Sequence, residues 1–315
     1  MINRSSGLIL ESYNIAEKTM KERATSFYQA FKLLPEDKFR SISAIYGFCR
    51  YADDGVDNDN ERQAKINSLK ILEERLNLLY SGNEDEDLIY LDMPWWMAFK
   101  DTIKNYKIPI VGFINQIEGQ RRDIDLNNIK SIDELIEYSR LVAGSVGVML
   151  APILVDDNKD ILNKEFIKSC ENLGVGMQIT NILRDIGEDY KTRKRIYIPE
   201  ELLEKYDVKP SYLEEYLSYK RGNSFRKSIS DNFIELWEEL ANLADIYYND
   251  YTKYISLFHP SARFPLVAAT LSYKAILDAV RKEDYNCLTK RCYTTLATRN
   301  KIIGQAREIV GRIVI

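Results

Sequence analysis

Apolar side chains recur every three to four positions along nearly all of this 315-residue chain, which is the spacing of one face of an α-helix. Residues 12–34 show the spacing clearly, with Ile15, Met20, Phe27 and Phe31 in step. No convincing run alternates apolar and polar residues as a strand would, and helix breakers are scarce, at 14 Gly and 8 Pro. The pattern predicts an all-α fold. Because no Pro/Gly/Ser-rich linker interrupts it, we expect a single domain over residues 1–315.

The same periodicity divides the chain into successive helices. We expect them over residues 12–34, 35–57, 64–82, 95–109, 111–126, 131–154, 165–190, 233–258 and 263–285, with a solvated acidic loop over 83–94. Within 131–154, Ala143, Gly144, Ser145 and Gly147 are small, so the backbone there can approach a neighbouring helix or a ligand closely. A helical bundle without any activity is compatible with this pattern taken alone.

Composition excludes several classes of function. The balance of 44 Lys+Arg against 48 Asp+Glu gives a net charge of −4, which argues against nucleic acid as a partner. His259 is the single histidine, so a di-iron bundle cannot be built, and a histidine-rich zinc site or a Ser-His-Asp triad is hard to build. Four cysteines without a CxxC pair indicate reduced thiols in a cytoplasmic protein. No stretch reaches the roughly 18 apolar residues that span a bilayer.

The segment CRYADDGVD carries two carboxylates at helical spacing. Asp53 and Asp57 are four residues apart, which on a helix places their Cβ atoms roughly 6 Å apart on one face, and Arg50 shares that face. Like charges at this spacing destabilise a helix by roughly 0.2–0.5 kcal/mol, so a structural helix gains nothing from them. Mg²⁺ reverses the argument because it takes oxygen ligands and is shared between carboxylates and substrate phosphates. A solvated acidic helix end is an equally good reading of this motif alone.

The segment QITNILRDIGED carries a longer polar stripe. Gln178, Asn181, Asp185 and Asp189 follow one another at helical spacing, and the rest of the circumference is filled by apolar residues, namely Met177, Ile179, Ile182, Leu183 and Ile186. A helix that is apolar on most faces is buried, and a buried carboxylate must be paired or bound to a metal. We therefore expect the stripe to line a cavity that holds cations. A buried hydrogen-bond network is the weaker alternative.

Basic and aromatic residues complete the candidate site. Arginine suits bidentate contacts with phosphate, and basic residues adjoin the second motif at Arg184, Lys191, Arg193, Lys194 and Arg195. The segment GQRRDID is similar in kind, and a surface position is as good a reading there. Phe27 and Phe31 are one turn apart and could form the wall or floor of an apolar tunnel. Tyr138 and Tyr273 are polar-tipped aromatic residues on otherwise apolar helices.

Several further segments accompany the two aspartate motifs: ATSFYQAFKLLP, AIYGFCR, LVAGSVGVMLAPIL, RIYIPEELL and ARFPLVAATLSYKAILDAVRKEDYN. Together, from about Tyr13 to Tyr285 and in the same order, they resemble the squalene/phytoene synthases, the head-to-head prenyltransferases. The resemblance implies an isoprenoid synthase helical bundle with a central cavity. It also implies that the two aspartate motifs face each other across the cavity mouth, with Mg²⁺ and two allylic prenyl diphosphates between them.

Carried over by motif, the resemblance assigns Asp53, Asp57, Asp185 and Asp189 to the Mg²⁺–diphosphate. It assigns Arg50 and Arg195 to diphosphate oxygens, and it places four residues at the reaction centre, namely Gln178, Asn181, Tyr138 and Tyr273. The family's basic residue in the N-terminal motif is here Thr25, so anion binding could shift to Arg23. The KTRKR loop is one residue longer than usual, which leaves the post-motif basic role open between Lys194 and Arg195.

Chain length is the remaining question. Phe27 and Phe31 match aromatic positions of the dehydrosqualene synthases, which favours C15 farnesyl diphosphate as substrate and dehydrosqualene as product. Ser43 is small where those enzymes tend to be bulky, which keeps a C20 phytoene synthase as the alternative. A squalene synthase would need NADPH, which we do not expect here, and a non-catalytic relative would not need all four aspartates. Peripheral contact with the inner face of a membrane and the oligomeric state are left open.

Overall fold

A computed structural model describes residues 4–57, 61–83, 93–155, 161–212, 216 and 229–313. Within these ranges the backbone is almost entirely helical, and β-structure is limited to two isolated bridges, Asn128 with Ile196 and Val155 with Phe258. The all-α prediction is therefore confirmed. The predicted acidic loop over 83–94 lies mostly outside the described residues.

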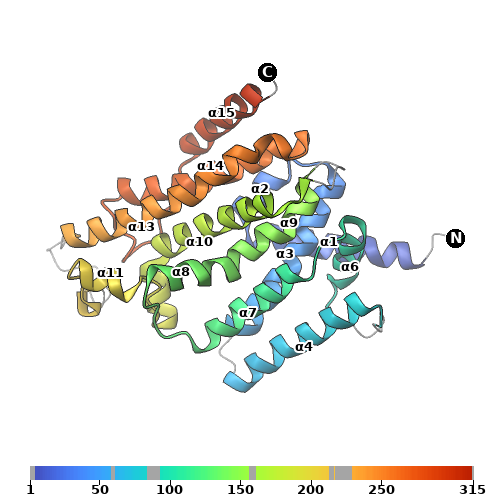
Figure 1. The fold of residues 1–315 in the computed structure, drawn as a ribbon, viewed down its shortest axis with the longest axis horizontal. Helices are drawn as coiled ribbons and strands as arrows, with labels where there is room; N and C mark the ends of the chain where they lie inside the picture. The colour runs from blue at the N-terminus through green and yellow to red at the C-terminus, as the bar shows by residue number, and fades with distance from the viewer. Residues whose placement is uncertain are drawn as a thin grey trace.

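The helices follow one another in an order close to the predicted one (Figure 1). They are α1 (Arg4–Arg23), α2 (Thr25–Phe31), α3 (Glu36–Asp57), α4 (Arg62–Ser81), α6 (Trp96–Tyr106), α7 (Val111–Asp125), α8 (Ile132–Ser139), η1 (Arg140–Gly144), α9 (Ser145–Leu154), α10 (Lys164–Arg193), α11 (Glu200–Lys205), α13 (Asp231–Asp250), η3 (Tyr251–Leu257), α14 (Pro260–Lys282) and α15 (Leu296–Ile313).

The single helix predicted over residues 12–34 is wrong in one respect, because the helix breaks at Ala24. This residue leaves the helical conformation, with φ −135° and ψ 57°, and separates α1 from the short α2. No side chain caps the start of α2, so the break has no sequence signal of the usual kind. Its consequence is positional: α2 turns Phe27 and Phe31 toward the interior of the bundle, where they line the central cavity.

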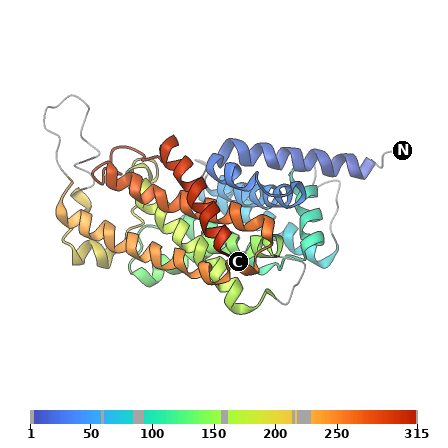
Figure 2. The same cartoon turned by 90° about the horizontal axis from the view of Figure 1, so that it is seen from above.

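Helix α10 forms the centre of the bundle and packs against α9, α13 and α14 (Figures 1 and 2). Its apolar residues Ile179, Ile182, Leu183 and Ile186 are buried, as the sequence predicts for a helix with a single polar stripe. The apolar core continues from α1 to α15. Because α10 is buried on most faces, its polar residues Gln178 and Asn181 are held in position against the cavity.

Segment 131–154 forms a single helical path whose middle turn is a π-helix, η1. This path lies against α10 at very short range. A Cβ atom on Gly147 would lie 2.1 Å from the carbonyl oxygen of Cys170, and one on Gly174 would lie 2.3 Å from that of Ala143. The small residues expected to allow close approach therefore do so between helices.

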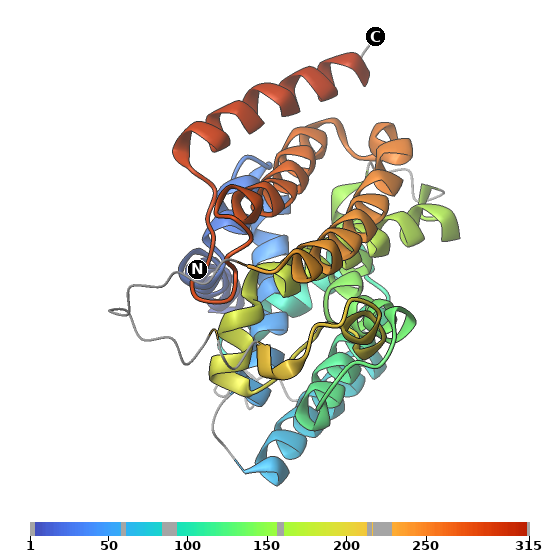
Figure 3. The same cartoon turned by 90° about the vertical axis from the view of Figure 1, so that its left-hand side faces the viewer.

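The C-terminal helix α15 packs against α14 and lies across the outside of the bundle (Figure 3). Its buried residues are Ile302 and Ala306, whereas Leu296 is exposed. Within the described ranges, no helix combines the length and the apolar character needed to cross a bilayer.

Candidate active site

A cavity of about 360 Å³ opens between α2, α3, α7, α9, α10 and α14. Its lining contains both polar or charged side chains and apolar ones. Carboxylate and amide groups come from Asp53, Asp123, Gln178 and Asn181, and arginine comes from Arg193. Most of the remaining wall is apolar or aromatic, including Phe27, Phe31, Ile45, Leu150, Leu154 and Phe258. Such a cavity fits a ligand with a charged head and a long hydrocarbon tail.

The first aspartate motif occupies the last turns of α3. Asp53 lines the cavity and accepts a hydrogen bond from Gln120 Nε2 at 2.5 Å. Arg50 is ion-paired with Asp54, one turn on. The Arg50 Nε atom is buried and has no hydrogen-bond partner among the described residues. A buried unpaired donor is costly and would suit a negatively charged partner, but Arg50 is not among the residues that line the cavity. Asp57 closes α3, and its side chain lies outside the described part of the structure.

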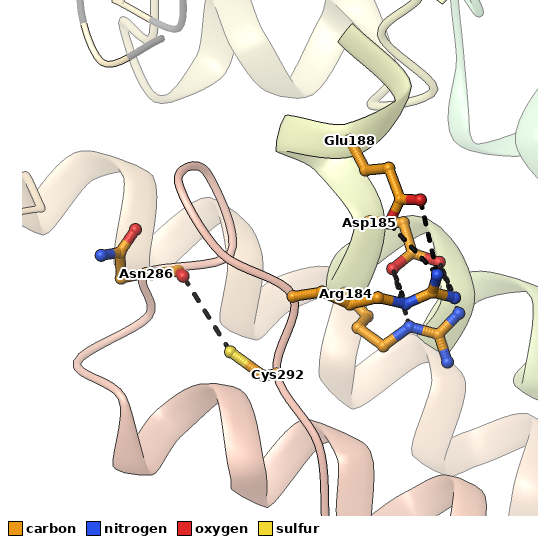
Figure 4. A network of polar contacts seen from close by, with 6 residues as sticks. Arg184, Asp185, Glu188, Asn286 and Cys292 are labelled. Carbon is orange, nitrogen blue, oxygen red and sulfur yellow. Dashed lines mark hydrogen bonds and ion pairs between the residues drawn. The ribbon is translucent and has the colours of Figure 1, made fainter. Parts of the chain in front are cut away.

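Only the first part of the second motif, up to Asn181, lines the cavity. Gln178 and Asn181 line it two turns and one turn before Asp185, respectively. Asp185 accepts a hydrogen bond from Arg184 Nε at 2.7 Å and another from Arg291 Nη2 at 3.2 Å (Figure 4). Arg291 also reaches Glu188 at 3.2 Å. The Asp185 carboxylate thus lies between two guanidinium groups, one of them from the loop that follows α14.

Gly187 allows this loop to come close. Its N–H donates to the carbonyl oxygen of Cys287 at 3.2 Å. A Cβ atom at position 187 would lie 1.9 Å from the carbonyl oxygen of Leu288, which no side chain tolerates. Glycine between Asp185 and Asp189 is therefore what lets the chain place Arg291 on the second motif.

The second carboxylate of the motif, Asp189, has a perturbed pKa. Burial raises the pKa of its carboxyl group to about 7, an effect opposed by nearby Arg193 and reinforced by Asp185. An ionised carboxylate that is desolvated without sufficient positive charge is destabilising. A bound divalent cation would supply that charge. The raised pKa of Asp189 therefore agrees with the expectation that this motif needs a bound cation.

We expect the stability of the cation-free protein to depend on Asp189 and pH. The folded-state pKa is raised from its ordinary value of 3.8, so ionisation weakens the fold as pH rises from about 4 to about 7. Asp189→Asn removes the ionisation and should raise the unfolding free energy by up to about 4 kcal/mol at pH 8, and by little at pH 4. Urea unfolding in EDTA at both pH values measures this. Parallel pH curves for the two proteins would contradict it.

A buried polar network forms the wall of the cavity near the end of α8. Asp123 of α7 accepts hydrogen bonds from Tyr138 Oη at 3.1 Å and Tyr197 Oη at 3.0 Å. It also forms an ion pair with Arg195 at 2.8 Å. Asp123 is only 4% exposed. Burial, together with the Asp123 charge, raises the pKa of Tyr138 well above its ordinary value, so this phenol stays protonated.

The remaining predicted residues are placed as follows. Tyr273 lines the cavity, and burial raises its pKa. Arg195 contacts the cavity wall through Asp123, whereas Lys194 is exposed and lies 5.2 Å from the Tyr190 ring centroid. Arg23 is exposed at the end of α1, next to Ala24, which lines the cavity.

Sequence reasoning missed part of the site. Tyr46 lies one turn before Arg50 on the stripe of α3 and lines the cavity, and burial raises its pKa to about 12. On α7, Gln116, Gln120 and Asp123 form a second stripe; Gln120 and Asp123 belong to the segment GQRRDID, for which a surface position is an equally good reading of the sequence, and Gln116 was not predicted. Both stripes have helical spacing that could have revealed them. On α7 the signal was masked by the neighbouring Arg121 and Arg122, which point outward.

The donor set suits a hard cation, although the protein side chains do not form a complete cage. Among the described side chains, no group of three or more Asp, Glu, His or Cys residues lies close enough to hold a metal. Oxygen donors nevertheless face the cavity from α3 and α10, and the Asp189 carboxylate lacks sufficient positive charge. Mg²⁺ commonly uses one or two carboxylates, with water and substrate phosphates completing its shell. The residues present therefore fit such an ion.

Comparisons with known proteins identify the fold and the family. The chain is 33% identical over 301 residues to a 4,4'-diapophytoene synthase of Staphylococcus haemolyticus, covering 95% of this chain and 97% of that protein. It is 30% identical over 309 residues to a chloroplastic phytoene synthase of Daucus carota, covering 98% of this chain and 71% of that protein. A crystal structure of a dehydrosqualene synthase in complex with ligand superposes with a TM-score of 0.82 at 30% identity, covering 96% of this chain and 98% of that one.

The expected isoprenoid synthase bundle is thereby confirmed. The family model described as squalene/phytoene synthase matches residues 20–298, a range that includes both aspartate motifs and the residues that line the cavity. On these grounds the chain belongs to the squalene/phytoene synthase family of head-to-head prenyltransferases.

Proposed function

We propose that this protein joins two molecules of farnesyl diphosphate head to head to give dehydrosqualene, with Mg²⁺ as its metal. The observation that carries the proposal is the cavity itself. It has Asp53, Gln178 and Asn181 among its polar lining, and Phe27 and Phe31 in its apolar wall. This arrangement suits a diphosphate head and a hydrocarbon tail in one enclosed space.

The apolar end of the cavity favours the shorter C15 chain. Phe27 and Phe31 pack edge to face with ring centroids 4.4 Å apart, and Phe31 is only 2% exposed. Ser43, whose small size kept a C20 substrate open, is fully buried; its hydroxyl donates to the carbonyl oxygen of Phe39 at 2.9 Å and lies 3.4 Å from Met20 Sδ. The Met20 thioether therefore occupies space beside Ser43, and this supports a short tunnel. The identity to phytoene synthases makes C20 geranylgeranyl diphosphate the second candidate.

In the proposed reaction, one allylic diphosphate ionises and its cation alkylates the double bond of the second molecule. Proton loss then gives a cyclopropylcarbinyl diphosphate, which ionises, rearranges and loses a second proton to form the triene. Bound Mg²⁺ would be held by Asp53, Asp57, Asp185 and Asp189 and would stabilise negative charge on the departing diphosphate. The buried Arg50 Nε would donate to a diphosphate oxygen, while the apolar wall would keep water from the cation.

Product analysis tests the proposal directly. Purified protein is incubated with Mg²⁺ and either farnesyl or geranylgeranyl diphosphate, with and without NADPH, and the hexane extract is examined by mass and ultraviolet absorption. A C30 conjugated triene from farnesyl diphosphate is the expected result. A C40 triene would instead identify a phytoene synthase, and squalene formed only with NADPH would identify a squalene synthase. Failure to form product from either substrate would favour a non-catalytic relative.

Phe31→Ala should lengthen the product. Removing the ring takes away the barrier that it forms with Phe27, so a C20 substrate gains room in the tunnel. We expect the ratio of C40 to C30 product, measured with both substrates in competition, to rise about tenfold, the effect of roughly 1.4 kcal/mol in a hydrophobic pocket. Phe39→Leu is a suitable control, since Phe39 is buried behind α2 against Tyr28 and does not line the cavity. An unchanged ratio in Phe31→Ala would show that Phe31 does not limit the length of the substrate chain.

A further inference from the structure

Asp123 is a buried carboxylate outside both aspartate motifs. Its Oδ1 atom accepts from two phenols, Tyr138 at 3.1 Å and Tyr197 at 3.0 Å, and its Oδ2 atom accepts from Arg195 at 2.8 Å. Three parts of the chain meet at this one side chain: α7, α8 and the segment after α10. A charge with 4% exposure is stable only when it is paired and hydrogen-bonded, and here both conditions hold.

The two phenols differ in what else they touch. Tyr138 and Asp123 line the cavity, whereas Tyr197 lies behind them. The two rings stack with centroids 5.5 Å apart and an angle of 24° between their planes, which fixes the plane of the Tyr138 ring. Arg195 donates to the Tyr197 oxygen at 3.5 Å as well as to Asp123. The Tyr197 proton is therefore also directed toward Asp123.

A phenol has a single proton to donate. Because Tyr138 gives this proton to Asp123, its oxygen can offer only lone pairs to whatever occupies the cavity. Lone pairs attract a carbocation and repel a diphosphate oxygen. If the proton pointed into the cavity, both preferences would be reversed. The direction of this single O–H bond thus determines which half of the substrate Tyr138 stabilises.

We propose that Asp123 is a positioning residue of the reaction, which holds the Tyr138 hydroxyl with its lone pairs toward the carbocation formed in the cavity. The proposal rests on the proposed function, since it requires a cationic intermediate. Arg195 balances the Asp123 charge, so the network orients a dipole beside the cavity without adding net charge there.

Asp123→Asn tests the proposal because it should reverse the dipole. An amide has one acceptor oxygen, and the guanidinium of Arg195 is the strongest donor available to it. The amide NH₂ group then faces the tyrosines, and Tyr138 must accept from it and turn its own proton toward the cavity. We expect kcat for triene formation to fall by about tenfold to a hundredfold, the effect of one charge-assisted hydrogen bond, while KM changes little. Uncyclised alcohols from water capture, and the cyclopropylcarbinyl diphosphate, should increase relative to triene.

Tyr197→Phe is the matched control. It removes the other donor from the same Asp123 oxygen but leaves the Tyr138 bond in place, so the ratio of by-products to triene should stay at the wild-type value. Tyr138→Phe should raise that ratio. In the Tyr138→Phe background, adding Asp123→Asn should not raise it further, because Asp123 acts through Tyr138.

Two results would overturn the proposal: an equal change of product ratio in Tyr197→Phe and Asp123→Asn, or a further change when Asp123→Asn is added to Tyr138→Phe. If Asp123→Asn does not fold, the comparison of Tyr138→Phe with Tyr197→Phe decides alone, and equal ratios would refute the proposal. The assay of the wild-type protein distinguishes a failure of the proposed function from a failure of the role proposed for Asp123. Wild-type protein that makes no triene refutes the proposed function, whereas normal wild-type turnover with unshifted variants refutes only the role of Asp123.

Discussion

Under the proposed function, Asp185→Asn is expected to lower kcat by at least about a thousandfold, because it removes a carboxylate that would hold the Mg²⁺ and thereby stabilise negative charge on the departing diphosphate. The Asp185 side chain is 14% exposed and is contacted by Arg184 and Arg291. Asparagine keeps its shape but cannot neutralise either guanidinium or bind a cation as a carboxylate does. The helical circular dichroism should be unchanged, since the backbone of α10 is held by buried apolar residues.

Glu188→Gln provides a matched control for that experiment. Glu188 lies less than one turn further along α10, is 48% exposed and contacts the same Arg291 at 3.2 Å. It is not one of the four aspartates that the two motifs assign to the Mg²⁺–diphosphate. Removing its charge should change kcat by less than about fivefold, because exposed ion pairs contribute little. Turnover of Asp185→Asn within tenfold of the wild-type value would refute the assignment of Asp185 to the metal and diphosphate.

Gly174→Ala is expected to lower the unfolding free energy by about 3 kcal/mol or more, at the upper end of what an overpacked core shows. The added Cβ atom would lie 2.3 Å from the carbonyl oxygen of Ala143 and 2.8 Å from the Cα atom of Gly144. These are backbone atoms of a neighbouring helical segment, so no side-chain rotation relieves the overlap. The segment η1 and α10 must separate, and this disturbs the wall that also carries Val142 and Gly147.

Gly304→Ala makes the same chemical change where space is open. Apart from its chain neighbours and the backbone of its own helix, no atom of the described residues lies within 4 Å of a Cβ at position 304 in α15. There the substitution should leave stability unchanged or raise it by up to about 1 kcal/mol, since alanine favours a helix. Urea unfolding of both variants with wild-type protein measures the difference. An equal midpoint for Gly174→Ala and wild-type protein would show that η1 and α10 can move apart at no cost.

The sequence predicts those features of the fold that depend on local spacing. The period of 3.6 residues locates α3, α10 and α14. The stripe of α10 is expected to line a cavity along its length, and this holds for Gln178 and Asn181 but not for Asp185 and Asp189, which are not among the lining residues. The break at Ala24 is not predictable in this way. It has neither proline nor glycine nor a capping side chain, and it is set by the packing of α2 within the bundle.

Features that join distant parts of the chain also escape a local reading. Arg291 lies 106 residues after Asp185, and nothing in the segment around Arg291 indicates that it meets the second motif. The π-helical turn η1 arises where a helix is pressed against α10, so its cause lies in another part of the chain. Asp123 combines the two cases. Its place on a polar stripe of α7 can be predicted from helical spacing, but its three hydrogen-bond partners, at positions 138, 195 and 197, cannot.

The position of Arg291 against Asp185 has a consequence for the order in which ligands arrive. Arg184 and Arg291 act as built-in counter-ions of this carboxylate, so under the proposed function a lone metal ion would have to compete with charges that are tethered and never diffuse away. A metal–diphosphate complex would meet no such competition, since its phosphate oxygens could take over the arginines while its cation takes the carboxylate. Binding then exchanges one set of ion pairs for another. Metal and substrate are therefore expected to enter as a single unit, with weak affinity for either one alone.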